Sequence, residues 1–218
     1  MAENLPVPGK PLMRGWLHLG AAPLALIAGM VLVVFAPTLA GRISTAIFTL
    51  TAVMLFGTSA VYHRGDWSDR TKAVLRRMDH ANIFLIIAGT YTPLTVLLLD
   101  GTTRITVLII VWSGALIGLL LRIFWLGAPR WLYVPLYVAL GWVAMGYIVP
   151  FYEAGGAAVV TLIIVGGLSY TVGAVFYGTK WPRGSERYFG FHEIFHALTI
   201  LGFLCHYIAI ALVVFQAQ

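Results

Sequence analysis

Seven stretches of about 20 apolar residues follow one another along the chain, and this repetition limits the folds open to it. A helix needs about that length to cross the hydrocarbon core of a bilayer. Of the 218 residues, 60% are hydrophobic and 10% are charged, which is more apolar surface than a soluble domain of this length can bury. The predicted spans cover residues 16–36, 43–63, 79–99, 103–124, 131–150, 157–178 and 191–214.

The spans predict an all-α, polytopic membrane protein, a seven-transmembrane helix bundle. A β-barrel is excluded because the runs are continuously apolar, whereas barrel strands alternate over about 10 residues. We expect residues 14–218 to form one transmembrane domain and residues 1–13, which are polar and rich in proline, to be a disordered cytoplasmic N-terminus. The run after residue 13 is too long for a signal peptide and has no Ala-x-Ala site before Arg42, so it is interpreted as a retained helix.

The net charge of +6 is distributed in a way that predicts topology rather than nucleic-acid binding. If the N-terminus is cytoplasmic, the inside segments hold twelve lysines and arginines and the outside loops hold two, Arg42 and Arg104. This positive-inside bias predicts an outside C-terminus and a multi-pass protein of the cell (inner or plasma) membrane. The inside residues are Lys10, Arg14, Arg64, Arg70, Lys72, Arg76, Arg77, Arg122, Arg130, Lys180, Arg183 and Arg187.

Four polar residues fall at the cytoplasmic end of their spans in this topology. His63 closes the second run, Asp79 opens the third, and His192 and His196 open the last. Residues four apart lie one turn apart on the same helix face, so His192 and His196 can bind one ion. With His63 they form a three-histidine zinc set that leaves a fourth position open. Magnesium and calcium prefer oxygen ligands, and the single cysteine, Cys205, cannot build a cysteine site.

Two further side chains are candidates for chemistry beside the zinc, which activates water at neutral pH. Asp79 either orients that water as a base or binds the metal directly as a fourth ligand. Ser59, one turn before His63, braces that histidine, donates to a developing oxyanion, or simply packs between helices. For His18, His80 and His206 we expect ordinary interfacial positions at headgroups or backbone.

Residues 192–196 also match H-E-x-x-H, the signature of zinc peptidases in which the glutamate is the general base. Intramembrane metalloproteases add a ligand from a later Leu-Asp-Gly. Here Leu99-Asp100-Gly101 precedes the motif and belongs to the opposite membrane side. We therefore interpret Glu193 as a first-turn acid at a helix N-terminus, where it is favourable with the helix dipole.

The chain resembles the haemolysin III family, the bacterial branch of the progestin and adiponectin receptor (PAQR) superfamily, which also includes alkaline ceramidases. The resemblance spans nearly the whole chain and implies that His63, His192 and His196 bind zinc, that Asp79 contacts the activated water and that Ser59 lines the site. It rests on four stretches: Ser59-Ala-Val-Tyr-His63, Arg77-Met-Asp79-His80-Ala-Asn82-Ile, Ile87-Ala-Gly89-Thr90-Tyr91-Thr92-Pro93 and His192-Glu-Ile-Phe-His196.

The function expected from these observations is zinc-dependent hydrolysis of a lipid amide or ester, with a membrane lipid as substrate or ligand. One alternative is a non-enzymatic sensor or regulator with structural zinc and Asp79 as a direct ligand. Another is a pore-forming haemolysin or cation transporter, although the outer halves of the spans offer little polar lining. We also expect Pro93, Pro135 and Pro150 to kink helices, and Gly114 and Gly118 to permit close packing rather than a dimer contact.

Overall fold

The computed structural model describes residues 11–125, 127–182 and 188–216, and within these ranges it is helical with no strand. Residues 1–10 of the segment expected to be disordered lie outside the described residues, and Pro11 to Gly15 form turns that lead into the first helix. The helices are α1 Trp16–Phe35, α2 Leu39–Arg64, α3 Asp69–Leu98, α4 Gly101–Phe124, α5 Arg130–Gly141, the 3-10 helix η1 Trp142–Tyr147, α6 Ile148–Thr179 and α7 Phe191–Gln216.

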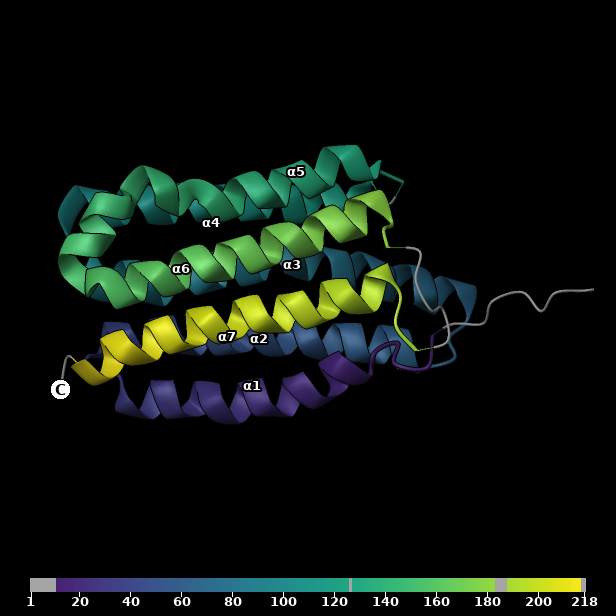
Figure 1. Ribbon diagram of the computed structural model, residues 1–218, viewed down its shortest axis with the longest axis horizontal. Helices are drawn as coiled ribbons and strands as arrows, with labels where there is room; N and C mark the ends of the chain where they lie inside the picture. Colours follow the sequence, from purple (N-terminus) through teal and green to yellow (C-terminus); the bar gives the residue numbers. More distant parts are fainter. Residues whose placement is uncertain (1–10, 126, 183–187, 217–218) are drawn as a thin grey trace, which may run out of the picture.

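The helices run roughly along one long axis and form a bundle (Figure 1). Helices that follow each other in the chain pack together from α1 to α4, and α6 packs along α7. Helix α7 also contacts α1 and α3, so the two ends of the chain close the bundle. This closure brings the first turns of α1 and α7 to the same end as the last turn of α2.

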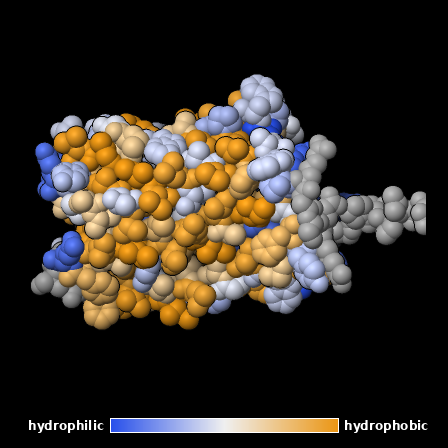
Figure 2. Space-filling view, in the orientation of Figure 1, coloured by the Kyte–Doolittle hydropathy of each residue, from blue (hydrophilic) through white to orange (hydrophobic). Residues whose placement is uncertain are grey.

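The outer surface of the bundle is apolar over its middle, and its hydrophilic side chains gather toward the two ends (Figure 2). Large hydrophobic side chains are exposed on several helices, such as Ile27, Ile117 and Val175. In water this exposure would be unfavourable, whereas in lipid it is the expected surface. Within the described part of the chain, six helical stretches are long and apolar enough to cross a membrane, so the chain is a multi-pass membrane protein.

Helix α3 begins ten residues before the predicted span, at residue 69 rather than 79. The Ser68 side chain accepts a hydrogen bond from the Thr71 backbone N–H and caps the helix there. Hydropathy finds only the apolar part of such a helix, because the exposed first turns are polar. Asp79 therefore lies about three turns inside α3 instead of at its start.

The predicted fifth and sixth spans, residues 131–150 and 157–178, are joined without a loop, because α5, η1 and α6 follow one another directly from Arg130 to Thr179. Gly156, with φ 75° and ψ 179°, interrupts this stretch. Glycine adopts positive φ without steric penalty, which explains why the break falls there and not at Pro150. In Figure 1 the chain turns back at the left end, between α5 and the main part of α6, and these two helices pack together.

Candidate metal centre

His63, His192 and His196 meet at one end of the bundle and form the candidate metal centre. One nitrogen from each ring lies within 4.8 Å of the others. The Nε2 atoms of His63 and His192 are 3.0 Å apart. His63 comes from the last turn of α2, and the other two come from the first two turns of α7. The predicted spacing of four residues brings the α7 rings to a centroid distance of 4.4 Å.

Asp79 and Ser59 lie beside the three histidines. The Oδ2 atom of Asp79 is 3.9 Å from Nε2 of His63, and both side chains are buried. Among the described residues, Asp79 is not part of the group whose ligand atoms converge on one point. Ser59 is 1% exposed, lines the same cavity as Asp79, and its hydroxyl has no hydrogen-bond partner among the described residues.

His18 is a member of this neighbourhood that the sequence did not reveal. It is 2% exposed, and its ring stacks on His196 with a centroid distance of 3.8 Å and an interplanar angle of 9°. The expectation of an interfacial position for His18 is therefore wrong. The sequence signal was weak because α1 offers a single histidine, and only the closure of the bundle places it on His196.

The histidine group fits a zinc ion by its donor chemistry and spacing. Zinc takes imidazole nitrogens at about 2.0–2.1 Å, so two ligand nitrogens in a tetrahedral site lie roughly 3.3 Å apart. The 3.0 Å separation of His63 and His192 is close to that value, and His196 lies within 4.8 Å. The spacing of the three rings therefore suits a single zinc ion, which these histidines would hold.

Glu193 performs a structural task at the start of α7. It is 1% exposed, accepts a hydrogen bond from the Gly190 backbone N–H at 2.8 Å, and forms an ion pair with Arg14. It thereby caps α7 and holds the segment before α1 against it, as expected for a first-turn acid. Asp100 is at the α3–α4 connection, 94% exposed and paired with Arg104, so it supplies no ligand to this centre.

A second set of buried polar side chains, contributed by α3, α4 and α6, lies next to the three histidines. His80 Nδ1 lies 2.9 Å from Nη2 of Arg122, and its Nε2 lies 3.2 Å from the Tyr177 hydroxyl. The Arg122 guanidinium stacks on Tyr133 at 4.1 Å from the ring centroid. Arg122, counted above among the cytoplasmic cations, lies in the last turn of α4 and is 2% exposed.

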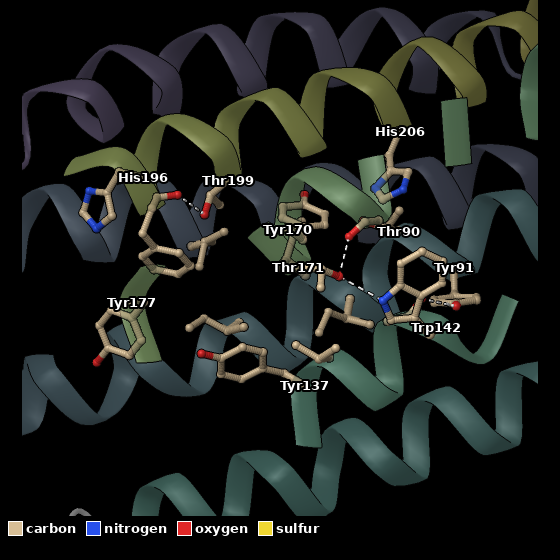
Figure 3. A pocket seen from close by; sticks show the side chains of 18 of the residues that line it. Thr90, Tyr91, Tyr137, Trp142, Tyr170, Thr171, Tyr177, His196, Thr199 and His206 are labelled. Atoms are coloured by element: carbon tan, nitrogen blue, oxygen red, sulfur yellow. Dashed lines mark hydrogen bonds between the residues drawn. The ribbon is translucent and has the colours of Figure 1, made fainter. Parts of the chain in front are cut away.

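The candidate metal centre opens on an internal cavity that runs between the helices (Figure 3). The cavity contains about 1110 Å³ of empty space, counting its open part. His196 and Tyr177 lie toward one end in Figure 3, and Thr90, Trp142 and His206 lie toward the other. Its walls are mainly apolar, with Leu55, Ile83, Ile86, Ile87, Val138 and Phe195 among the lining residues.

The fold and the site define a multi-pass helical membrane protein with a three-histidine group at the end of an apolar cavity. The haemolysin-III related family matches residues 8–207, so the chain belongs to that family. A protein named hemolysin-3 homolog from Bacillus subtilis (strain 168) is 33% identical over 160 residues, which is 73% of this chain and 72% of the relative. Hemolysin-3 of Bacillus cereus is 34% identical over 125 residues, 57% of this chain and 54% of that protein. These relatives are consistent with a bacterial plasma membrane location.

Proposed function

We propose that this protein is a zinc-dependent hydrolase that cleaves an amide or ester bond of a membrane lipid. The observation that carries the proposal is the position of His63, His192 and His196 at the end of an apolar cavity, with Asp79 beside them. A soluble substrate would not need an apolar chamber within the bilayer, whereas an acyl chain would. Membership of the haemolysin-III related family fits the proposal but does not identify a substrate.

The proposed topology has seven crossings with the N-terminus in the cytoplasm and the C-terminus outside. The stretch from Arg130 to Thr179 has 50 residues, which as a straight helix would be about 75 Å long. The hydrocarbon core is only about 30 Å thick. The interruption at Gly156 therefore supports two crossings in this stretch, and the candidate metal centre then lies at the cytoplasmic side.

In the proposed mechanism each side chain has a distinct task. His63, His192 and His196 would hold the zinc, which when bound supplies an electrophile and activates water for attack on an acyl carbon. The Asp79 carboxylate, 3.9 Å from His63 Nε2, would orient that water and accept its proton. The Ser59 hydroxyl would donate a hydrogen bond to the developing oxyanion. The apolar wall would hold the acyl chain and exclude bulk water.

The test replaces Asp79 with asparagine, which keeps the size of the side chain and removes its charge and basicity. Asp79→Asn should retain about one zinc per chain and lose hydrolysis of N-acyl lipid amides and acyl esters by roughly 10²-fold or more. The matched control is Asp100→Asn, because Asp100 lies exposed at the opposite end and should affect neither quantity. The zinc content of each purified protein is measured by mass spectrometry. The same measurement on His196→Ala should show that this variant has lost the metal.

Two results would contradict the proposal. Zinc-free wild-type protein purified without chelators would remove the metal from the mechanism altogether. Zinc bound by three histidines and a carboxylate, seen by X-ray absorption in a protein without turnover, would instead assign the metal a structural role.

A further inference from the structure

The cavity end away from the candidate metal centre holds three polar side chains with buried, unused hydrogen-bonding atoms. They are Thr90 of α3, Tyr170 of α6 and His206 of α7, here called the distal polar cluster. Among the described residues, the Thr90 and Tyr170 hydroxyls and Nδ1 of His206 have no hydrogen-bond partner. Thr90 is 6% exposed and His206 is 8% exposed, and Figure 3 shows all three around one part of the cavity.

Other polar groups near this end of the cavity are satisfied within the protein, whereas the Tyr137 hydroxyl, farther along the wall, is another one without a partner among the described residues. Trp142 donates to the Thr171 hydroxyl at 2.9 Å, and Thr171 donates to the Gly167 carbonyl at 2.8 Å. The Tyr91 hydroxyl bonds both the Gly141 carbonyl and the Ala144 backbone N–H. Because buried polar groups in folded proteins are nearly always paired, the unused atoms of the distal polar cluster need an explanation.

The packing of α6 against α7 makes room for two members of this cluster. A Cβ atom at Gly166 of α6 would lie 2.6 Å from Nε2 of His206, and one at Gly202 of α7 would lie 2.9 Å from the Tyr170 ring. Each helix therefore places a glycine opposite the other helix's polar aromatic residue. His206 also uses Nε2 to contact the Ile163 carbonyl at 3.2 Å, which directs the ring and leaves Nδ1 free.

The distance between the two ends of the cavity indicates what kind of molecule fits. His196 and His206 are ten residues apart on α7, which corresponds to about 15 Å along the helix. The wall between them is mainly apolar. A matching ligand is an amphiphile with a polar head at the histidines, an apolar segment, and a second oxygen-bearing group about 15 Å away.

We propose that the distal polar cluster is a second binding subsite that hydrogen-bonds an oxygenated group on the acyl chain of the lipid, such as a mid-chain hydroxyl. A hydroxyl both donates and accepts, so it can satisfy a histidine nitrogen and a tyrosine or threonine hydroxyl together. The subsite thereby selects oxygenated chains over plain ones. The inference rests on the proposed function only for the placement of the lipid head at the candidate metal centre.

The experiment measures binding of stearic acid and of hydroxystearic acids with the hydroxyl near the carboxylate, at mid-chain or at the methyl end. Binding to detergent-solubilised full-length protein is followed by displacement of a fluorescent fatty acid. Wild type should prefer the mid-chain acid over stearic acid by roughly tenfold. Thr90→Val and Tyr170→Phe, which keep shape and remove only the unused hydroxyls, should lose this preference and still bind stearic acid.

Two control variants separate the possible failures. Thr199→Val removes a cavity hydroxyl that already bonds the Phe195 carbonyl, so it should keep the preference. His196→Ala should weaken all the acids alike and leave their ratio unchanged, so a failed zinc site is distinguished from a failed subsite. Equal affinities in wild type, no binding of any acid, or a preference that survives in the double variant Thr90→Val/Tyr170→Phe would each overturn the proposal.

Discussion

His18 of α1 stacks face to face on His196 of α7, and its ring centroid lies 5.0 Å from that of Phe56, with the two planes inclined at 65°. The ring is thus enclosed by aromatic groups from two helices. Stacking already restricts the orientation of the His196 ring, so metal binding costs this ligand less conformational entropy. Groups that orient metal ligands affect metal affinity even without touching the ion.

The first prediction concerns this stack. His18→Ala should lower zinc affinity on the order of tenfold, because the His196 ring loses the surface that orients it. His18→Phe restores a flat ring of similar size and should recover most of that affinity. Competition with chelators of graded strength measures the difference. Equal zinc affinity in His18→Ala and wild type would show that the stack does not support the centre.

The second prediction concerns Glu193, whose carboxylate holds Arg14 and the Gly190 backbone N–H. Glu193→Gln should lower the free energy of unfolding by about 1–3 kcal/mol, since a buried hydrogen-bonded charge is removed. Zinc content and any lipid hydrolysis should persist, because this side chain serves the helix start. Thermal unfolding and turnover are measured on the same preparation. Loss of turnover with unchanged stability would instead support a peptidase-like base.

Among the helices, glycine determines how closely neighbours approach. Gly118 of α4 faces the Phe84 ring of α3, and Gly114 faces Leu140 of α5. The expectation that these glycines serve close packing is confirmed by contacts within the chain. In lipid, where no hydrophobic effect drives helices together, such contacts supply much of the association energy.

A pair of alanine substitutions tests this packing. Gly118→Ala should destabilise the bundle by about 1–3 kcal/mol, because the new methyl group would overlap the Phe84 ring. Gly57→Ala is the control, since a Cβ there meets nothing within 4 Å and alanine favours the helix by about 0.5–1 kcal/mol. Thermal unfolding in detergent compares them. Similar melting temperatures for both variants would contradict the packing argument.

At the scale of the whole molecule, the two ends of the helix bundle differ in which side of the membrane they face. The candidate metal centre and the start of α1 share one end, and the last turn of α7 lies at the other (Figure 1). The distribution of lysine and arginine predicts that the centre faces inward.

Cysteine labelling decides the orientation, since the natural Cys205 is buried and gives little background. Asp66→Cys lies in the exposed connection between α2 and α3, and Thr102→Cys lies at the exposed start of α4. In intact cells a membrane-impermeant maleimide should label Thr102→Cys only, and Asp66→Cys should react after permeabilisation. The reverse pattern would invert the proposed topology.

Local patterns predicted those parts of the site that belong to a single helix. The four-residue spacing of His192 and His196 and the position of His63 at a helix end both hold in the structure. Predictions failed where a charged or polar segment extends a helix beyond its apolar run, as at the start of α3. The burial of Arg122 could not be foreseen in this way, because hydropathy does not tell which face of a helix end turns inward.

The sequence by itself determined that the chain is helical and resides in a membrane, because residue hydropathy and helix periodicity are local properties. It also placed the histidines and Asp79 at a common depth. Only the tertiary structure decided that His18 stacks on His196, that Arg122 is buried beside His80, and that the distal polar cluster shares one cavity. Those contacts depend on the rotation and packing of helices far apart in the chain, which no local pattern encodes.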